Sequence, residues 1–315
     1  MMRRGPTRRT GLAAAATMAL AISGSIGPSA AGPAVGQFEL KSLDSEPGEV
    51  EFQSQNAYAF GNPDRKTIVG PGGDIDADDN SLARQRNALE LEFGITRYLK
   101  TRIGIEYEKE RRDDPTTVQS ADGYEDLKLD EYAVEAIGII IPRKGDGVGL
   151  GVVVEYEIAA ESGGGQSLNF GPIFEWAKGP WSVTIIPTFV QFFGGERNEA
   201  GQQDEKIDFA YANQLKYHWS QNLDIALEAY GTIDRVGGRG GRSDEAALFG
   251  DFDQHRLGPV VYWNLTPPFA KSSEKDSDDK DGDDEEMVSL GIGTLFGLND
   301  NTPNTTLKLS MEVYF

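Results

Sequence analysis

The chain has 315 residues, a formal net charge of −21 and no cysteine. The absence of thiols excludes a disulfide framework and a thiolate metal site, and the acidic balance argues against nucleic acid or anionic lipid as a direct ligand. Glycine is frequent, at 38 residues, which favours turns and strands over long helices. No stretch beyond the N-terminal region reaches about 18 consecutive apolar residues, so no transmembrane helix is expected there.

The first 31 residues have the layout of a secretory signal peptide. A basic head (Arg3, Arg4, Arg8 and Arg9) precedes an apolar run over residues 11–22, which is too short to span a bilayer as a helix. Small residues then offer a cleavage site near Ala31. We therefore expect export, with residues 32–48 as an N-terminal periplasmic segment. The same leader also suits a soluble exported protein, and Arg8-Arg9 also permits a twin-arginine signal, so the leader alone does not decide the fold.

Alternation of apolar and polar residues decides the fold class. Over residues 207–219 one face carries Ile207, Phe209 and Tyr211 while Asp208 lies on the other, and the run is long enough to cross a hydrocarbon core. The same alternation recurs at 50–60, 89–96, 103–108, 148–158, 223–228, 257–263 and 307–315. Less regular segments are 125–141, 167–177, 181–193 and 287–297. We predict an all-β protein, a transmembrane antiparallel up-and-down barrel of twelve strands within residues 49–315.

Two of the irregular segments carry more detailed expectations. The alternation over 125–141 changes parity near Glu131, which predicts a β-bulge. Both faces of 181–193 are largely apolar, so its lumen side stays unassigned. A soluble β-sandwich is the rival class, but its strands average only about 5–6 residues.

The links between these strands alternate in length. Long links lie at about 61–84, 109–124, 161–166, 194–206 and 235–253, and short ones at 97–100, 143–147, 178–180 and 220–222. Because outer-membrane barrels have long outer loops and short periplasmic turns, both termini are expected in the periplasm. The exception is the acidic insert at about 266–286, which we interpret as a disordered linker. Its likeness to an EF-hand fails, because Ser277 and Val288 stand at the first and twelfth positions of the loop.

Alternate positions of the predicted strands should line the lumen. These candidate selectivity residues are Glu90, Glu92, Arg102, Glu106, Glu108, Glu155, Glu157, Asp208, Lys216, Asp224, Glu228, Arg256, Lys308 and Glu312. Acids exceed bases, so an open barrel should favour cations. Neighbouring acids such as Glu106 and Glu108 would also suit a protease or metal site, although charged lumen walls are the simpler explanation.

Aromatic residues near the short turns predict a membrane-interface girdle. The candidates are Tyr98, Trp176, Trp181, Tyr217, Trp219 and Trp263. Stacking on sugars is the alternative role for a few of them.

Catalysis has one candidate motif. His218-Trp219-Ser220 has the His-x-Ser spacing found in outer-membrane phospholipase, but Thr232 stands where that family needs a polar orienting residue such as Asn. His218 also lies near a periplasmic turn and not near the outer leaflet. With only one other histidine, His255, in the chain, we expect no enzyme, no metal site and no cofactor.

The end of the chain resembles the terminal signal by which the barrel assembly machinery recognises outer-membrane proteins. Lys308, Val313 and Phe315 match that pattern, while Ser310 stands where glycine is usual. The resemblance implies the assembly machinery and outer-membrane lipid as partners.

The stretch LELEFGITRYLKTRIGIEYE (residues 89–108) resembles a hairpin of the putative outer-membrane transporters related to the phenol meta-degradation pathway. Gly94, Ile95, Thr96 and Gly104 carry the likeness, which covers about twenty residues closely. It implies passage of small molecules, so a channel for cationic or neutral solutes is the leading hypothesis. The alternative is a closed barrel with a structural or partner-binding role. A salt-bridged ladder of lumen charges would favour the closed barrel, and an axial gap would favour transport.

Overall fold

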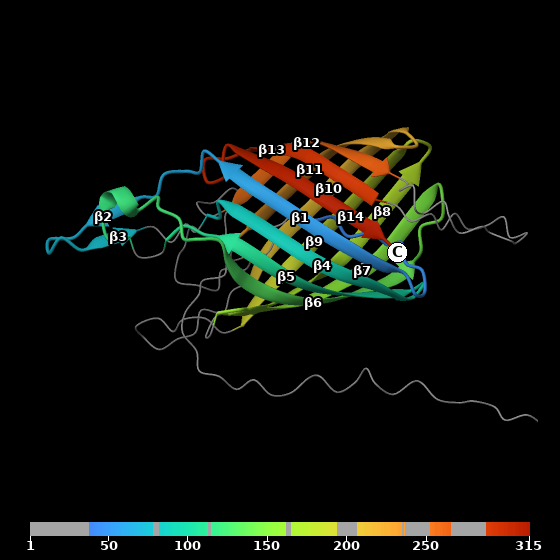
Figure 1. Ribbon diagram of the computed structural model, residues 1–315, viewed down its shortest axis with the longest axis horizontal. Helices are drawn as coiled ribbons and strands as arrows, with labels where there is room; N and C mark the ends of the chain where they lie inside the picture. Colours follow the sequence, from blue (N-terminus) through green and yellow to red (C-terminus); the bar gives the residue numbers. More distant parts are fainter. Residues whose placement is uncertain are drawn as a thin grey trace, which may run out of the picture.

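The computed structural model describes residues 38–77, 82–112, 115–161, 165–193, 207–234, 236, 253–265 and 288–315. The predicted signal peptide and the acidic insert lie outside these ranges. Twelve antiparallel strands close into a single barrel (Figure 1). Each barrel strand pairs with the next barrel strand in the chain, so β1 pairs with β4, and the pairing of β1 with β14 closes the ring. The predicted fold class and strand number are confirmed.

Ten of the twelve barrel strands have eleven or more residues, or about the length that a tilted strand needs to cross a membrane. In chain order the barrel strands are β1 (Val50–Phe60), β4 (Gln85–Thr96), β5 (Leu99–Lys109), β6 (Lys128–Ile141), β7 (Gly147–Ala159), β8 (Gln166–Lys178), β9 (Trp181–Phe193), β10 (Ile207–Ser220), β11 (Leu223–Ile233), β12 (Gln254–Leu265), β13 (Val288–Gly297) and β14 (Thr305–Tyr314).

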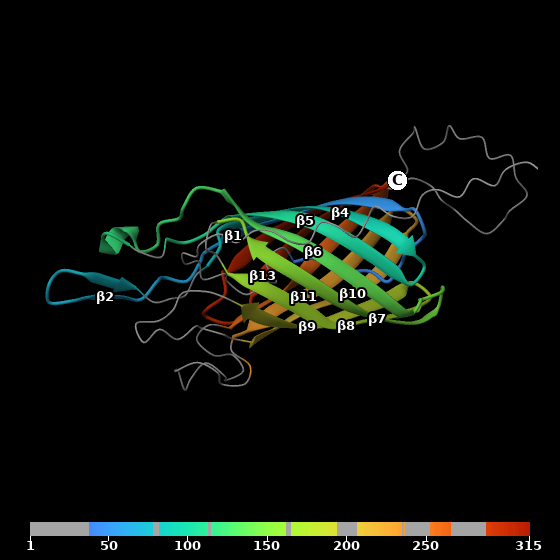
Figure 2. The ribbon, with the colours of Figure 1, turned by 90° about the horizontal axis from the view of Figure 1, so that it is seen from below.

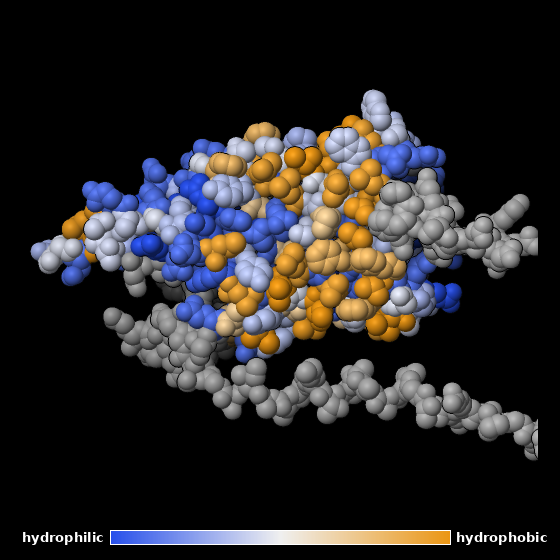
Figure 3. Space-filling view, viewed as in Figure 1, coloured by the Kyte–Doolittle hydropathy of each residue, from blue (hydrophilic) through white to orange (hydrophobic). Residues whose placement is uncertain are grey.

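The strands alternate between a polar inner face and an apolar outer face. On β7, Glu155 and Glu157 are buried inside the barrel, whereas Val152 and Val154 are exposed on its outside. Exposed apolar side chains gather over the half of the wall nearer the C-terminus (Figure 3). A closed barrel with an apolar exterior and a charged interior satisfies its backbone internally and suits a lipid environment.

The two ends of the barrel differ. Short turns and the C-terminus share one end, while a projection lies at the other (Figures 1 and 2). The projection contains a short hairpin of β2 (Thr67–Val69) and β3 (Ile75–Ala77) and the 3-10 helix η1 (Val118–Ser120). By the usual rule for such barrels, the short turns are periplasmic and the projection lies outside the cell. None of these three small elements was expected from the sequence.

The structure contains the predicted bulge and shows which face of β9 lines the lumen. The register of β5 and β6 shifts between the pairs Glu106–Glu131 and Tyr107–Leu129, so Asp130 is the extra residue of the predicted bulge. On β9, Ile186 and Val190 are buried in the barrel interior, while Ile185 is exposed on the outside, which assigns its lumen face. Within the described residues no helix is long and apolar enough to cross a membrane.

Candidate functional site

The N-terminal residues 38–48, which we call the inner segment, run from inside the barrel to its short-turn end. Residues 38–43 are buried or half-buried, whereas Asp44 and residues 46–48 are exposed. The sequence predicts a periplasmic position for these residues, as for the rest of 32–48. Instead, Phe38 packs edge-on against Tyr230 of β11 with 5.3 Å between ring centroids, and Leu43 is only 1% exposed. The segment therefore occupies the lumen from the short-turn end to the outer half.

Backbone contacts fix the inner segment where it enters at the short-turn end. The Gly48 amide donates to the Gly94 carbonyl at 2.8 Å, and the Gly94 amide donates to the Glu49 carbonyl at 3.0 Å. A Cβ at Gly94 would collide with the carbonyl of Glu46, so this position requires glycine. The glycine that carries part of the family likeness thus has a structural role here.

Higher in the lumen, the side chain of Leu43 fills a recess that glycines leave in β7. A Cβ added at Gly149 would lie 3.0 Å from Leu43 Cδ1, and one at Gly151 would lie 3.7 Å from Leu43 Cγ. The Leu43 amide donates to Glu175 Oε1 at 2.8 Å. This part of the inner segment is held by packing as well as by polar contacts.

Arg102 of β5 is the centre of a buried ion-pair cluster. It is 2% exposed and pairs with Glu39 of the inner segment. Its guanidinium also lies 2.9 Å from Glu92 Oε2 and 3.3 Å from Glu90 Oε2. Its Nε lies 3.6 Å from Glu135 Oε1. A single cation therefore bridges the inner segment to carboxylates of β4 and β6.

The second base of this cluster is Lys41 of the inner segment. It pairs with Glu135 and lies 3.6 Å from Glu155 Oε2. Burial opposes ionisation of the neighbouring Glu39, but Arg102 and Lys41 outweigh it and lower the pKa of Glu39 from 4.5 to about 2. Burial likewise opposes the charge on Lys41, yet the surrounding glutamates raise its pKa well above the usual value. Both groups of the inner segment are charged at neutral pH.

A separate network lies along the inner face of β10, β11, β12 and β14, which are on one side of the ring. Lys308 Nζ lies 2.7 Å from Glu228 Oε2, and its ammonium donates to the Tyr230 hydroxyl at 2.9 Å. The hydroxyl of Tyr262 and the amide of Gln214 donate to Oε1 of Glu228. All five side chains are buried, so this network fills the lumen next to these strands, on the side of the ring opposite β5.

Two cavities along the lumen are small. A space of about 50 Å³ lies beside Glu106 and Glu157, and one of about 40 Å³ lies above Phe38, each with room for a few water molecules. The short-turn end opens into a vestibule of about 680 Å³ that is lined by Lys216 and Glu312. In this conformation the inner segment obstructs the barrel.

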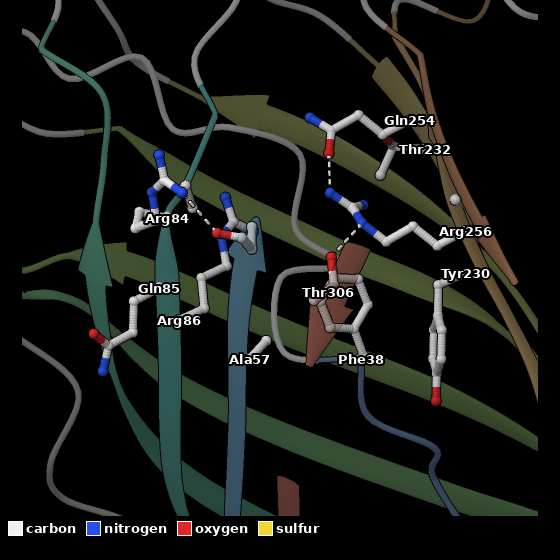
Figure 4. Close-up of a pocket in the computed structure, with 13 residues that line it drawn as sticks. Phe38, Ala57, Arg84, Gln85, Arg86, Tyr230, Thr232, Gln254, Arg256 and Thr306 are labelled. Carbon is white, nitrogen blue, oxygen red and sulfur yellow. Dashed lines mark hydrogen bonds between the residues drawn. The ribbon is translucent and has the colours of Figure 1, made fainter. Parts of the chain in front are cut away.

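The space above Phe38 has an unusual lining. Guanidinium groups of Arg84, Arg86 and Arg256 converge on it from two parts of the wall, with the Phe38 ring beneath (Figure 4). Arg86 pairs with Glu108 at 2.8 Å. This outer pocket is basic within a lumen that is otherwise rich in acids.

The structure places the predicted lumen residues on the inner face of the barrel. Those that are buried there are Glu90, Glu92, Arg102, Glu108, Glu155, Glu157, Asp208, Asp224, Glu228, Arg256 and Lys308, and those that are half-buried are Glu106, Lys216 and Glu312. Their role in selectivity stays a prediction.

Several charged residues of the lumen are not among those predicted from the sequence. Lys100, which pairs with Glu92 at 2.7 Å, and Arg86 share the parity of predicted lumen positions, so extending the alternation would have found both. Glu135 was missed because the bulge obscured the parity of β6. No periodic signal marks Glu39 and Lys41.

The predicted girdle aromatics lie near the short-turn end. Trp181 packs against Tyr217 at 4.7 Å, and Tyr217 packs against Trp219 at 6.2 Å. Trp263 and Tyr98 are exposed, while Trp176 is half-buried. Their membrane-interface role stays a prediction.

The proposed assembly signal has mixed surroundings. Phe315 is exposed and its amide donates to the Val50 carbonyl at 2.9 Å, while Val313 pairs with Phe52 of β1. Lys308 points inward to Glu228. Its structural role in the lumen is therefore independent of any part in assembly.

The His-x-Ser motif is not assembled as a catalytic pair. His218 Nδ1 lies 2.9 Å from Asp224 Oδ1 at the vestibule, whereas the Ser220 hydroxyl accepts from the Asn222 amide at 3.4 Å. A register shift between His218 and Ser220 separates them along β10. Among the described residues no group of three or more His, Asp or Glu side chains is placed to hold a metal ion.

The closed barrel, its apolar exterior and its charged lumen define the chain as a transmembrane β-barrel of the outer-membrane type. Among solved structures, it is similar in architecture to the NanC porin, at 8% identity and a TM-score of 0.46 over 84% of this chain and 98% of that chain. It is also similar to the KdgM porin, at 6% identity and a TM-score of 0.41 over 85% of this chain and 99% of that chain. A third similar structure is the translocator domain of the autotransporter NalP from Neisseria meningitidis, at 10% identity and a TM-score of 0.41 over 86% of this chain and 89% of that chain.

These similarities concern the general architecture alone. No family model matches the sequence, and no curated protein is similar to it. Nothing in the comparisons links the chain to the transporters related to the phenol meta-degradation pathway, so that part of the family likeness is unsupported.

Proposed function

We propose that the protein is an outer-membrane channel for small cationic or neutral solutes, which the inner segment closes in this conformation. The observation that supports the proposal is the nature of the obstruction. The segment precedes β1 and adds no strand to the barrel, and its contacts with the wall are noncovalent. Removing it would leave the twelve-strand ring of hydrogen bonds complete.

The charge of the wall supports the preference for cations. Glu155 and Glu157 of β7 lie beside Glu106 of β5, around the small cavity in the middle of the lumen. Lys41 of the inner segment contributes a positive charge to this region. Withdrawal of the segment would remove that charge and expose a carboxylate-rich path, whose field attracts cations.

The second candidate is a permanently closed barrel with a structural or partner-binding role. The ion pairs of Arg102 favour it, because they tie Glu39 to the wall through a buried cation. The two candidates differ in whether the inner segment leaves the lumen under any condition.

Conductance in a planar bilayer tests the proposal. The mature chain is compared with a variant that begins at Pro47, both refolded and checked for a folded barrel by circular dichroism and by heat-dependent gel migration. We expect the shortened barrel to conduct in stable steps, with a cation-selective reversal potential in a potassium chloride gradient. A folded but silent shortened barrel would establish the closed candidate, and anion selectivity would refute the proposed role of the acids.

A crosslink provides the matched control. Because the chain has no cysteine, L43C with G151C gives a single thiol pair, and a sulfur at position 43 would lie close to the new Cβ. Any openings of the full chain should disappear when this pair is oxidised and return on reduction. Openings that persist in the oxidised form would show that current does not require movement of the inner segment.

A further inference from the structure

We propose that the outer pocket is a binding site for an anionic group, a carboxylate or phosphate of a small solute, held chiefly by Arg256. Arg84 and Arg86 complete the site, and Phe38 forms its floor (Figure 4). This inference concerns ligand binding in the closed conformation, and it does not require that the barrel conducts.

Arg256 is a buried cation with neutral neighbours. This side chain of β12 is 8% exposed, yet within the described part of the chain no carboxylate lies within ion-pair distance of it. Its guanidinium donates to the Gln254 Oε1 at 2.7 Å and to the Thr306 hydroxyl at 3.2 Å, and it lies 5.0 Å from the centre of the Phe38 ring. All of these partners are neutral. Arginine does not deprotonate in proteins, so a buried positive charge remains without an opposite charge.

The pocket around Arg256 carries further positive charge. Arg84 also contacts only neutral groups in the described residues, since it donates to the Ala59 carbonyl at 3.0 Å and lies over the Tyr124 ring at 4.4 Å. Arg86 is balanced by Glu108. Three arginines therefore line the pocket, and no carboxylate is among its described lining residues, so positive charge is in local excess within an acid-rich lumen.

The wall of the cavity offers both hydrogen-bond donors and apolar contact. Guanidinium groups present a planar fork of donors that matches carboxylate and phosphate oxygens. Thr232 and Thr306 line the same space, while Phe38, Ala57 and Ala59 offer apolar contact. The free volume of about 40 Å³ holds a few water molecules, which a single anionic group could replace. The lining thus suits a small organic anion or inorganic phosphate.

Titration calorimetry on the refolded full-length mature chain in detergent tests the site, with sodium acetate and inorganic phosphate as separate probes. We expect saturable binding of at least one of them, and the two probes distinguish carboxylate from phosphate recognition. R256Q should weaken that binding by about tenfold or more, since a hydrogen-bonded charge is lost. R84Q should weaken it less, and R97Q, which alters an exposed arginine at the short-turn end, should leave it unchanged.

Thermal unfolding separates a binding role from a purely structural one. The anion that binds should raise the midpoint of the wild-type barrel and leave that of R256Q unaffected. Absence of saturable binding of both probes to the folded wild-type barrel would overturn the proposal. Equal binding by wild type and R256Q would overturn it as well. Neither result depends on conductance, so failure of this inference is distinguishable from failure of the proposed channel.

Discussion

Two arginines buried in the same lumen have opposite surroundings. Arg102, toward the short-turn end, is surrounded by four carboxylates, one of them on the inner segment. Arg256, toward the outer end, contacts neutral groups and an aromatic ring. A buried cation that is paired with carboxylates of the protein links the elements that carry them, whereas a buried cation without an anionic partner can bind an anionic ligand. We therefore infer that the ion pairs of Arg102 hold the inner segment in the lumen, whereas the outer pocket binds an anionic ligand.

Removal of Arg102 should have the largest effect. R102Q would leave Glu39, Glu90 and Glu92 buried without their shared cation, and breaking a buried ion pair costs about 3–5 kcal/mol. We expect a lower free energy of unfolding in urea and cleavage of the inner segment by protease in the folded barrel. Protonation of the orphaned carboxylates should partly restore stability at lower pH.

The matched control for this change is R97Q, which removes an arginine that is exposed at the short-turn end. It should unfold like the wild type. If R102Q also unfolded like the wild type, the ion pairs of Arg102 would not be what holds the inner segment.

Acid should weaken the same cluster through Glu39. The pKa of Glu39 is lowered to about 2, so its stabilising contribution is complete above the unfolded value of about 4.5 and is lost as the pH falls toward 2. A shift of this size corresponds to about 3 kcal/mol. Cleavage of the inner segment by pepsin should therefore increase between pH 4 and pH 2 while the barrel remains folded.

In E39Q the segment should already be accessible at pH 4, because the segment no longer offers a charged partner to Arg102. E46Q makes the same change on an exposed residue of the segment and should behave like the wild type. Equal cleavage of E39Q and wild type at pH 4 would contradict the proposed role of Glu39.

Apolar packing of Leu43 also retains the inner segment, and the L43A substitution tests how much it contributes. L43A would empty the recess formed by Gly149 and Gly151, at a cost of about 2–3 kcal/mol. Because the barrel strands do not depend on this contact, we expect faster hydrogen exchange of the backbone amides at position 43 and at Gly48, with little change in global unfolding. A fall in the global midpoint as large as that of R102Q would instead show that segment and barrel unfold together.

The sequence predicted the wall of the barrel better than its contents. A strand has a period of two residues, so the inner faces of β4, β5 and β7 could be assigned from alternation alone. The inner segment has no such period. Its partners Arg102, Glu135 and Glu175 come from different strands, and their meeting depends on the closure of the ring. The pairing state of Arg256 was hidden for the same reason, since a lumen charge can be assigned from parity but its neighbours across the lumen cannot.

The smallest expected effect makes the sharpest comparison between the two arginines. R256Q removes a buried charge that has no opposite partner, so in anion-free buffer the variant should be as stable as the wild type or more stable by up to about 1 kcal/mol. R102Q should show the opposite sign in the same urea titration. R256K, which keeps the charge but loses the planar fork, should keep the wild-type stability and bind acetate or phosphate more weakly. A clear loss of stability in anion-free R256Q would mean that its bonds to Gln254 and Thr306 hold the outer wall together, and the two arginines would then differ in their partners but not in their role.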